Sequence, residues 1–210
     1  DGLQVGMPVD LATADLLMGA TNGPTASVIS VADDLTNINN YGSLASFASV
    51  TATGVTLADA DNLPAGVSYL LNEDPTALQF GADVDLGAAN FLMGADNGPS
   101  ASDISVSDDL ANINSYGSLP SFSSVTVTDL TLAEAGSLPA GVDSYKLIES
   151  VDGTQVPMPV SVEEALILLG AANGPAPDSI SVADDASSLG ASINDLGGVG
   201  SVELNGGTTT

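Results

Sequence analysis

The sequence predicts an α/β repeat protein in which short strands and short helices alternate along the chain. Three observations lead to this class. An eight-residue motif recurs three times, helix starts recur at intervals of 22–30 residues, and short β-branched runs lie between them. A repeat of this length, with one strand and one helix, has the size of a leucine-rich-repeat coil.

The recurring motif is Leu-(Met/Leu)-Gly-Ala-x-Asn-Gly-Pro. It occupies residues 17–24, 92–99 and 168–175, so its copies lie 75 and 76 residues apart. We expect its Leu and Met in the core. We expect Asn-Gly-Pro to stop the helix, because Asn and Gly tolerate left-handed backbone and Pro cannot continue a helix.

The recurrences divide the 210-residue chain into copies 1–75, 76–151 and 152–210, the last of them incomplete. The chain starts at a repeat boundary and stops inside the third copy. We expect the three copies to form one continuous solenoid without polar caps at its ends, which favours head-to-tail association.

Each predicted helix follows a capping residue, carries apolar residues at i, i+3 and i+6, and ends at Gly or Pro. The starts fall at residues 11, 35, 57, 86, 110, 132, 162 and 186. Three starts have capping-box spacing: Thr56 with Asp59, Thr131 with Glu134, and Ser161 with Glu164.

The β-branched runs between these helices predict strands. They are residues 28–31, 49–53, 67–70, 104–106, 124–128, 144–148, 180–182 and 201–204. Strands joined through helices should be parallel. We therefore expect about eight coils with a parallel sheet on one side and helices on the other. Gln4-Val5, Gln79-Phe80 and Gln155-Val156 are candidates for an extra extended segment. The alternative is a series of tandem all-β sandwich domains of about 75 residues.

The charge of the chain excludes several function classes. It has 27 acidic residues, one basic residue and no His, for a formal net charge of −26. Such a surface repels nucleic acid and anionic membranes and attracts cations. No apolar run approaches the ~20 residues of a membrane-spanning helix, so we expect no membrane insertion. There is no Cys, which excludes disulfides and thiolate metal sites.

Three Asp pairs are the candidate metal ligands. They are Asp33 with Asp34, Asp108 with Asp109, and Asp184 with Asp185. Each pair lies where a strand passes into a helix, so the second Asp can be the N-cap while the first favours the helix dipole. The alternative is Ca²⁺, which prefers about six to eight oxygen ligands and would need partners such as Asn37 or Asn112.

We expect no enzymatic activity. Without His or Cys, and with Lys146 as the one basic residue, most pairs of a nucleophile and a base cannot be assembled. The acidic residues also recur in register, whereas an active site usually breaks a repeat.

Two segments carry a resemblance to a known class of proteins. Ile-Ser-Val-Ala-Asp-Asp-Leu-Thr-Asn-Ile at 29–38 and Ser-Val-Thr-Val-Thr-Asp-Leu-Thr-Leu-Ala-Glu-Ala at 124–135 resemble degenerate repeats of large acidic secreted bacterial surface proteins and adhesins, often associated with calcium-binding RTX repeats. The Gly-Gly-x-Gly-x-Asp element of RTX repeats is absent. The resemblance implies an extracellular location at the cell surface and an adhesive or structural role.

The leading hypothesis is therefore an extracellular structural protein that self-assembles head to tail into a filament, sheath or surface layer. The alternatives are an adhesin module that binds a glycan or host surface, and an acidic spacer that calcium stabilises.

Overall fold

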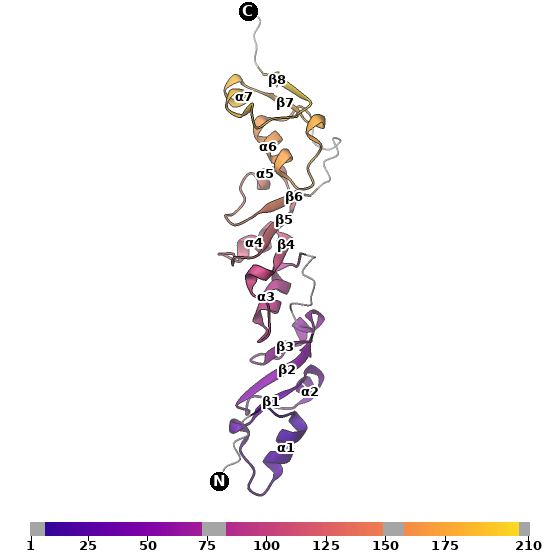
Figure 1. The fold of residues 1–210 in the computed structure, drawn as a ribbon, viewed down its shortest axis with the longest axis vertical. Helices are drawn as coiled ribbons and strands as arrows, with labels where there is room; N and C mark the ends of the chain where they lie inside the picture. The colour runs from indigo at the N-terminus through magenta and orange to yellow at the C-terminus, as the bar shows by residue number, and fades with distance from the viewer. Residues whose placement is uncertain (1–6, 73–82, 149–157, 206–210) are drawn as a thin grey trace, which may run out of the picture. The chain divides into compact units, whose positions relative to one another are not determined.

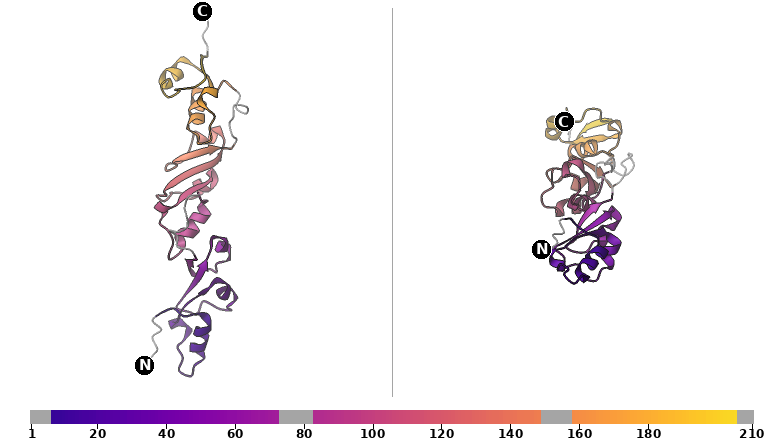
Figure 2. Two further views of the ribbon diagram at one scale, coloured as in Figure 1. Left: turned by 45° about the vertical axis from the view of Figure 1, so that its right-hand side comes forward. Right: turned by 60° about the horizontal axis from the view of Figure 1, so that its bottom comes forward.

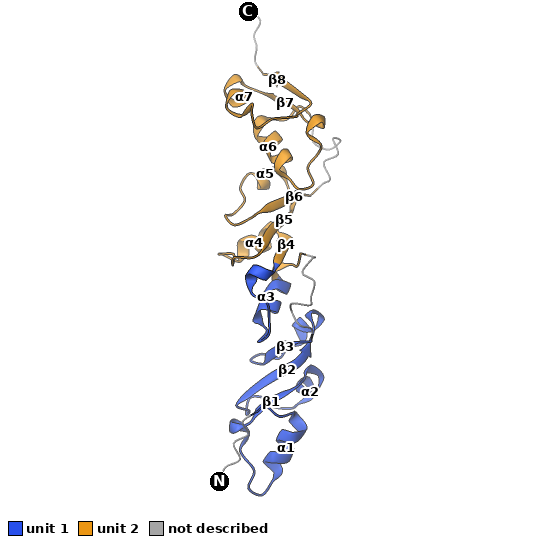
Figure 3. Ribbon diagram, viewed as in Figure 1, with its two compact units in different colours: residues 1–82, 87–104 blue, residues 83–86, 105–210 orange. Residues whose placement is uncertain are grey.

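The computed structural model describes residues 7–72, 83–148 and 158–205. The chain forms two compact units (Figure 3). Unit 1 contains Asp1–Ala82 and Gly87–Ile104, and unit 2 contains Asp83–Leu86 and Ser105–Thr210. The division falls inside the second repeat copy. The units and the sequence copies are thus two different ways of dividing the chain, and the copy boundaries stay a prediction from the sequence.

Unit 1 is built around a parallel sheet with the strand order β1 (Ser30–Asp34), β2 (Ser49–Val55), β3 (Ser68–Leu71) (Figure 1). Its helical segments precede, connect or follow these strands: α1 (Leu11–Gly19), the 3₁₀ turn η1 (Ala26–Val28), α2 (Leu35–Asn40), the 3₁₀ helix η2 (Leu57–Asn62), all but the first residue of α3 (Leu86–Gly94), and η3 (Ala101–Asp103).

Unit 2 contains two parallel sheets. One has the strand order β4 (Ser105–Asp109), β5 (Ser124–Leu130), β6 (Ser144–Leu147), and Figure 2 shows these strands side by side. The other pairs β7 (Ser181–Asp184) with β8 (Ser201–Leu204). Helical segments alternate with these strands: α4 (Leu110–Ser115), α5 (Leu132–Ala135), α6 (Val162–Gly170), η4 (Pro177–Ser179) and α7 (Ala186–Ser192).

The sheets repeat one register. The first strand of each sheet aligns its valine with a valine of the second: Val31 with Val50, Val106 with Val125, and Val182 with Val202. Before each first helix a further valine adds an isolated parallel bridge to the same strand, as Val9 does to Val31. Identical register follows from identical patterning, because a slip by one residue would turn the buried face of a strand to solvent.

The core of each copy uses the same positions. In unit 1, Ile29, Val31 and Ile38 are fully buried. Their counterparts in the other copies are buried as well: Ile104, Val106 and Ile113, then Ile180, Val182 and Leu189. Each such side chain contributes about 1.5–3 kcal/mol relative to an exposed position. Small aliphatic residues therefore build these cores, as the low aromatic content requires.

The predicted helix starts are confirmed. Helical segments begin at residues 11, 35, 57, 86, 110, 132, 162 and 186, although the one at Leu57 is a 3₁₀ helix. The three predicted capping boxes are formed. In each of them the acidic side chain accepts a hydrogen bond from the amide of the capping residue, and the hydroxyls of Thr131 and Ser161 accept one from the amides of Glu134 and Glu164. The short 3₁₀ turns before β1, β4 and β7 were not predicted, and η1 takes Val28 out of the first predicted strand.

The fold class is confirmed at the level of α/β with parallel strands. All strand pairs within the described ranges are parallel, which disagrees with the alternative of tandem β-sandwiches. These strands form three open sheets rather than a closed barrel. A single sheet running through all coils is not found among them. The candidate extended segments at 4–5, 79–80 and 155–156 lie outside the described residues.

Within residues 7–72, 83–148 and 158–205, no helix has the length and apolar character that crossing a membrane requires.

The explanation of Asn-Gly-Pro by left-handed backbone is wrong. Neither the Asn nor the Gly of any copy has a positive φ angle. Instead the glycine lies against the helix that it follows. A Cβ on Gly98 would stand 2.0 Å from the carbonyl oxygen of Leu92, and Gly23 and Gly174 are equally close to Leu17 and Leu168. The glycine is required for close approach rather than for conformational freedom.

This contact makes a direct prediction. Gly98→Ala should lower the free energy of unfolding by about 1–3 kcal/mol, the range for overpacked sites. Gly190→Ala should leave it unchanged or raise it by up to about 1 kcal/mol, since Gly190 lies in α7 and a Cβ added there would meet no atom within 4 Å. Urea melts of the two variants measure the contrast. Equal effects of the two substitutions would contradict the close-approach explanation.

Candidate functional site

The six predicted site residues lie at the carboxyl ends of first strands. Asp33 and Asp34 close β1, Asp108 and Asp109 close β4, and Asp184 closes β7 with Asp185 directly after it. The second member of each pair is the N-cap of the next helix, as predicted. Asp34 accepts a hydrogen bond from the amide of Asn37, Asp109 from Asn112, and Asp185 from Ser187 and Ser188.

The first Asp of each pair forms hydrogen bonds in addition to the expected interaction with the helix dipole. Oδ2 of Asp33 accepts a hydrogen bond of 2.9 Å from the amide of Leu11, the first residue of α1. Asp108 binds the amide of Leu86 in the same way at 2.9 Å, and Asp184 that of Val162 at 3.0 Å. These partners are 22 residues away in sequence. The carboxylate therefore joins the end of each first strand to the start of the helix before it.

The remaining oxygen of this carboxylate is also engaged. Oδ1 of Asp33 accepts hydrogen bonds from the amide of Asp34 and from Nδ2 of Asn37. Partial burial by itself raises the pKa of Asp33, but the hydrogen bonds from Asn37, Leu11 and Asp34 outweigh it, so the pKa lies below the ordinary 3.8. The pKa of Asp108 is lowered by the same balance of burial and hydrogen bonds.

These contacts bear on the calcium hypothesis. The structure brings Asn37 to Asp33 and Asp34, and Asn112 to Asp108 and Asp109, as calcium binding would need. The amide groups point their Nδ2 hydrogens at the carboxylates, so a cation would have to displace them. No group of three or more acidic, His or Cys side chains that could hold a metal is found among the described residues. Calcium binding at the six Asp residues stays a prediction.

A second arrangement joins one repeat copy to the next, and we call it the copy junction. It consists of the third strand of a copy and the loop after the first helix of the following copy. In unit 1 the Asn97 side chain accepts a hydrogen bond of 2.8 Å from the amide of Leu71 and donates one of 3.3 Å to its carbonyl. In unit 2 Asn173 does the same to Leu147, at 2.8 and 2.9 Å.

An amide side chain that binds both backbone groups of one residue acts as a strand partner. β3 and β6 are the outer strands of their sheets, and their free edges would otherwise present unpaired N–H and C=O groups. The next loop continues this pairing, because the amides of Asp96 and Ala172 donate to the carbonyls of Tyr69 and Tyr145 at 2.9 Å.

The tyrosines of these strands reach across the junction. Tyr69 donates a hydrogen bond to the carbonyl of Phe91 in α3, and its ring stacks on the Phe91 ring with centroids 4.9 Å apart. Tyr145 donates to the carbonyl of Ile167 in α6 at 2.8 Å. Burial raises the pKa of both tyrosines, and for Tyr69 the Asp96 carboxylate adds to the rise.

The glycines of the recurring motif make room for these hydroxyls. A Cβ on Gly94 would lie 2.6 Å from the Tyr69 hydroxyl oxygen, and one on Gly170 would lie 2.6 Å from that of Tyr145. The motif therefore contributes two contacts to the junction, its first glycine beneath a tyrosine and its asparagine at a strand edge.

The junction residues were not predicted from the sequence. The sequence alone predicts turns at the three Asn-Gly-Pro segments and does not connect these segments with Tyr69 or Tyr145. The signal was present, because a simple turn would tolerate Asp or Ser where all three copies carry Asn. The contact itself could not be predicted, since strand and loop are 26 residues apart.

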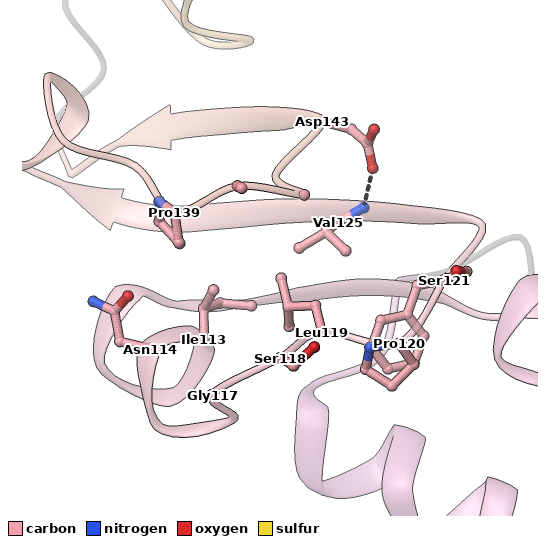
Figure 4. Close-up of a pocket in the computed structure, with 13 residues that line it drawn as sticks. Ile113, Asn114, Gly117, Ser118, Leu119, Pro120, Ser121, Val125, Pro139 and Asp143 are labelled. Atoms are coloured by element: carbon pink, nitrogen blue, oxygen red, sulfur yellow. Dashed lines mark hydrogen bonds between the residues drawn. The ribbon is translucent and has the colours of Figure 1, made fainter.

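Unit 2 also contains a cavity of about 500 Å³ (Figure 4). The loop after α4, the start of β5 and the loop before β6 line it, with Leu119, Pro120 and Pro139 among its apolar walls. Asp143 lies at its edge and accepts a hydrogen bond of 2.8 Å from the amide of Val125. Asp143 is the extra residue that lengthens the second period from 75 to 76, so this carboxylate has no counterpart in the first copy.

No protein-family model, curated protein or solved structure matches this chain.

The Asp33 bridge predicts a pH-dependent loss of stability. Asp33→Asn should lower the free energy of unfolding near pH 7 by about 1–2 kcal/mol. This is less than the ~1.5–3 kcal/mol typical of hydrogen bonds to charged groups, because the site is partly solvated. A depressed pKa stabilises the fold above the unfolded value of 3.8, and this contribution disappears as the pH falls through the folded value. The difference between wild type and variant should therefore shrink below about pH 4.

Urea melts at a series of pH values measure this difference. Asp61→Asn is the control, because it removes the same charge from an exposed side chain of η2. A loss that is equal in both variants would assign the effect to net charge rather than to the bridge.

The junction makes a second prediction, with the three copies as internal controls. Asn173→Ala should lower the free energy of unfolding by about 1–3 kcal/mol, because it leaves the buried Leu147 without partners for both backbone groups. Asn97→Ala should do the same through Leu71. Asn22→Ala should have little effect, since Asn22 is exposed. Thermal melts of the three variants measure this contrast. An equal loss of stability in all three would indicate that the asparagine stabilises its own turn rather than the junction.

Proposed function

We propose that this chain is an extracellular structural repeat protein that assembles with itself into a filament, sheath or surface layer. In this proposal the coils stack as an α/β solenoid, and the copy junction is the contact that passes from one copy to the next. The protein serves as a building element rather than as a catalyst.

The observation that carries the proposal is the recurrence of the junction. Two successive junctions use the same atoms: an Asn amide on a Leu backbone, a loop amide on a Tyr carbonyl, and a Tyr hydroxyl on a helix carbonyl. A contact that repeats with the sequence period can be extended copy by copy, which is how repeat proteins grow.

The charge supports a role in a cation-rich environment outside the cell. A net charge of −26 on 210 residues opposes both folding and association unless counter-ions screen it. We infer that divalent cations promote assembly, whether by screening or at the Asp pairs. The resemblance to acidic secreted surface proteins points to the same location.

In this proposal the protein is not a catalyst. The sequence has no His, no Cys and one Lys, so proton transfer and nucleophilic attack near neutral pH would depend on carboxylates, hydroxyls and Lys146. The acidic pairs in turn hold helix starts through their hydrogen bonds.

One observation favours a second function, that of a binding module in an adhesin. The cavity beside Asp143 has a volume within the range of small-ligand sites, and one of the residues that line it, Asp143, interrupts the repeat. Its lining of polar and apolar residues with a single carboxylate suits a small neutral or cationic group better than an anionic glycan.

The proposal predicts assembly of the purified chain. In millimolar Ca²⁺ or Mg²⁺, light scattering should report particles much larger than a 20.7 kDa monomer, and electron micrographs should show fibres or sheets. At equal ionic strength, divalent ions should promote assembly more strongly than NaCl if the Asp pairs bind them. They should promote it to the same extent if screening suffices.

A monomer under all these conditions would contradict self-assembly and leave the binding module or the acidic spacer as the function. Asp34→Asn with Asp109→Asn tests the calcium sites within the same experiment. The double variant should abolish any stronger effect of Ca²⁺ than of NaCl on assembly, but it should leave intact the assembly that depends on screening alone.

A further inference from the structure

We propose that the exposed face of α1 and the loop after it bind a β-strand of the form Ser-Tyr-x-Leu, presented by another copy of the repeat. We call this face the α1 surface and define it by Leu16, Gly19, Thr21 and Asn22. The inference rests on the proposed stacking of copies and names the surface and the partner by which a further copy would join.

The α1 surface is equivalent to the two surfaces that junctions already cover. Leu16 corresponds to Phe91 and Ile167, Gly19 to Gly94 and Gly170, Thr21 to Asp96 and Ala172, and Asn22 to Asn97 and Asn173. On α3 and α6, these positions supply the helix carbonyl, the space for the tyrosine, the loop amide and the strand-pairing side chain.

The α1 surface differs from the surfaces on α3 and α6 in its exposure to solvent. Leu16 is 76% exposed, whereas Phe91, which stacks on Tyr69, and Ile167 are half-buried. Asn22 is exposed, whereas Asn97 and Asn173 are half-buried. A surface with a largely exposed leucine and an exposed amide side chain offers apolar and hydrogen-bonding groups of the kind that a strand covers.

Gly19 gives an independent argument. Nothing lies within 4 Å of the position that its Cβ would take, so the described structure gives no reason for glycine at the end of this helix. Alanine there would stabilise a helix by up to about 1 kcal/mol. At Gly94 and Gly170 the reason is visible, because a tyrosine hydroxyl lies 2.6 Å from the Cβ position. A tyrosine docked on α1 would explain the glycine at position 19, because its hydroxyl would need the space that a Cβ takes at that position.

The two covered surfaces define the partner. β3 reads Ser-Tyr-Leu-Leu and β6 reads Ser-Tyr-Lys-Leu, so Tyr and the last Leu are shared and the residue between them varies. Tyr and Leu provide the contacts, the tyrosine through its hydroxyl and carbonyl and the leucine through both backbone groups. Within the described residues both such strands are already engaged by α3 and α6, so the partner strand belongs to another copy.

The test supplies this strand at its native spacing. Asp1 is equivalent to Asp152, so residues 141–151 (Gly-Val-Asp-Ser-Tyr-Lys-Leu-Ile-Glu-Ser-Val) are fused directly before Asp1 of the full chain. The added strand then precedes α1 by the same number of residues as β6 precedes α6. Its high effective concentration favours docking even where a free peptide would bind weakly.

We expect the fusion to raise the midpoint of thermal unfolding by a few degrees. The Thr21 amide should gain protection from hydrogen exchange, because it takes the role of the Asp96 and Ala172 amides. A fusion in which Tyr and the last Leu of the added strand are both replaced by Ser should gain neither.

Gly19→Ala is the matched variant. In the chain without the fusion it should leave stability unchanged or raise it slightly, since its Cβ meets no atom. In the fusion it should abolish the gain, because the Cβ occupies the place of the tyrosine hydroxyl. The inference is overturned if the fusion gains no stability, if Gly19→Ala does not affect the gain, or if the changes in exchange appear at Asp96 or Ala172 instead of Thr21.

The outcome separates this inference from the proposed function. If the unfused chain assembles while the fusion gains nothing, self-assembly stands and the α1 surface is not the docking site. If the fusion gains stability while the unfused chain stays monomeric, the docking site stands and self-assembly fails.

Discussion

The outer edges of β3 and β6 carry N–H and C=O groups that need partners, because an unpaired strand edge is both costly and open to other chains. In each case one asparagine side chain supplies both partners for a leucine, and the loop beside it pairs with a tyrosine carbonyl. The edge of one copy is therefore completed by the next. This requirement explains why helix, glycine and asparagine recur together as one motif, and it connects the local fold to the proposed stacking.

The acidic residues serve the fold as well as the surface. The first Asp of each pair holds the start of the preceding helix, and the second caps the following helix. In this way a carboxylate satisfies amides that helix ends leave unpaired. The same hydrogen bonds favour the ionised form and lower the pKa of Asp33 and Asp108. A chain with almost no basic residues thus uses backbone amides, rather than Lys or Arg, as the partners of its carboxylates.

Differences between copies show which contacts a copy can lose. Ser188 replaces the Asn37 and Asn112 of the other copies, yet Asp184 still binds the helix start at Val162. Asp129 takes the positive φ angle that Gly54 has in the first copy, at the same irregularity between the second and third strands. Asp143 is inserted before β6 without disturbing the tyrosine that follows. The bridge and the junction persist while their surroundings vary, as expected if they are the contacts that a copy requires.

The sequence by itself determined the local structure of this protein. Apolar spacing and capping residues fixed the helix starts and capping boxes, because these depend on neighbours three or four residues away, and β-branched runs between helices predicted parallel strands. The tertiary structure decided the division into separate sheets, the Asp33 bridge to Leu11, and the roles of Gly94 and Asn97. These contacts join residues 22–26 positions apart, and no local pattern states which strand edge an asparagine will meet. The motif marked the important residues, but only the packed copies gave the reason, a tyrosine above the glycine and a strand edge beside the asparagine.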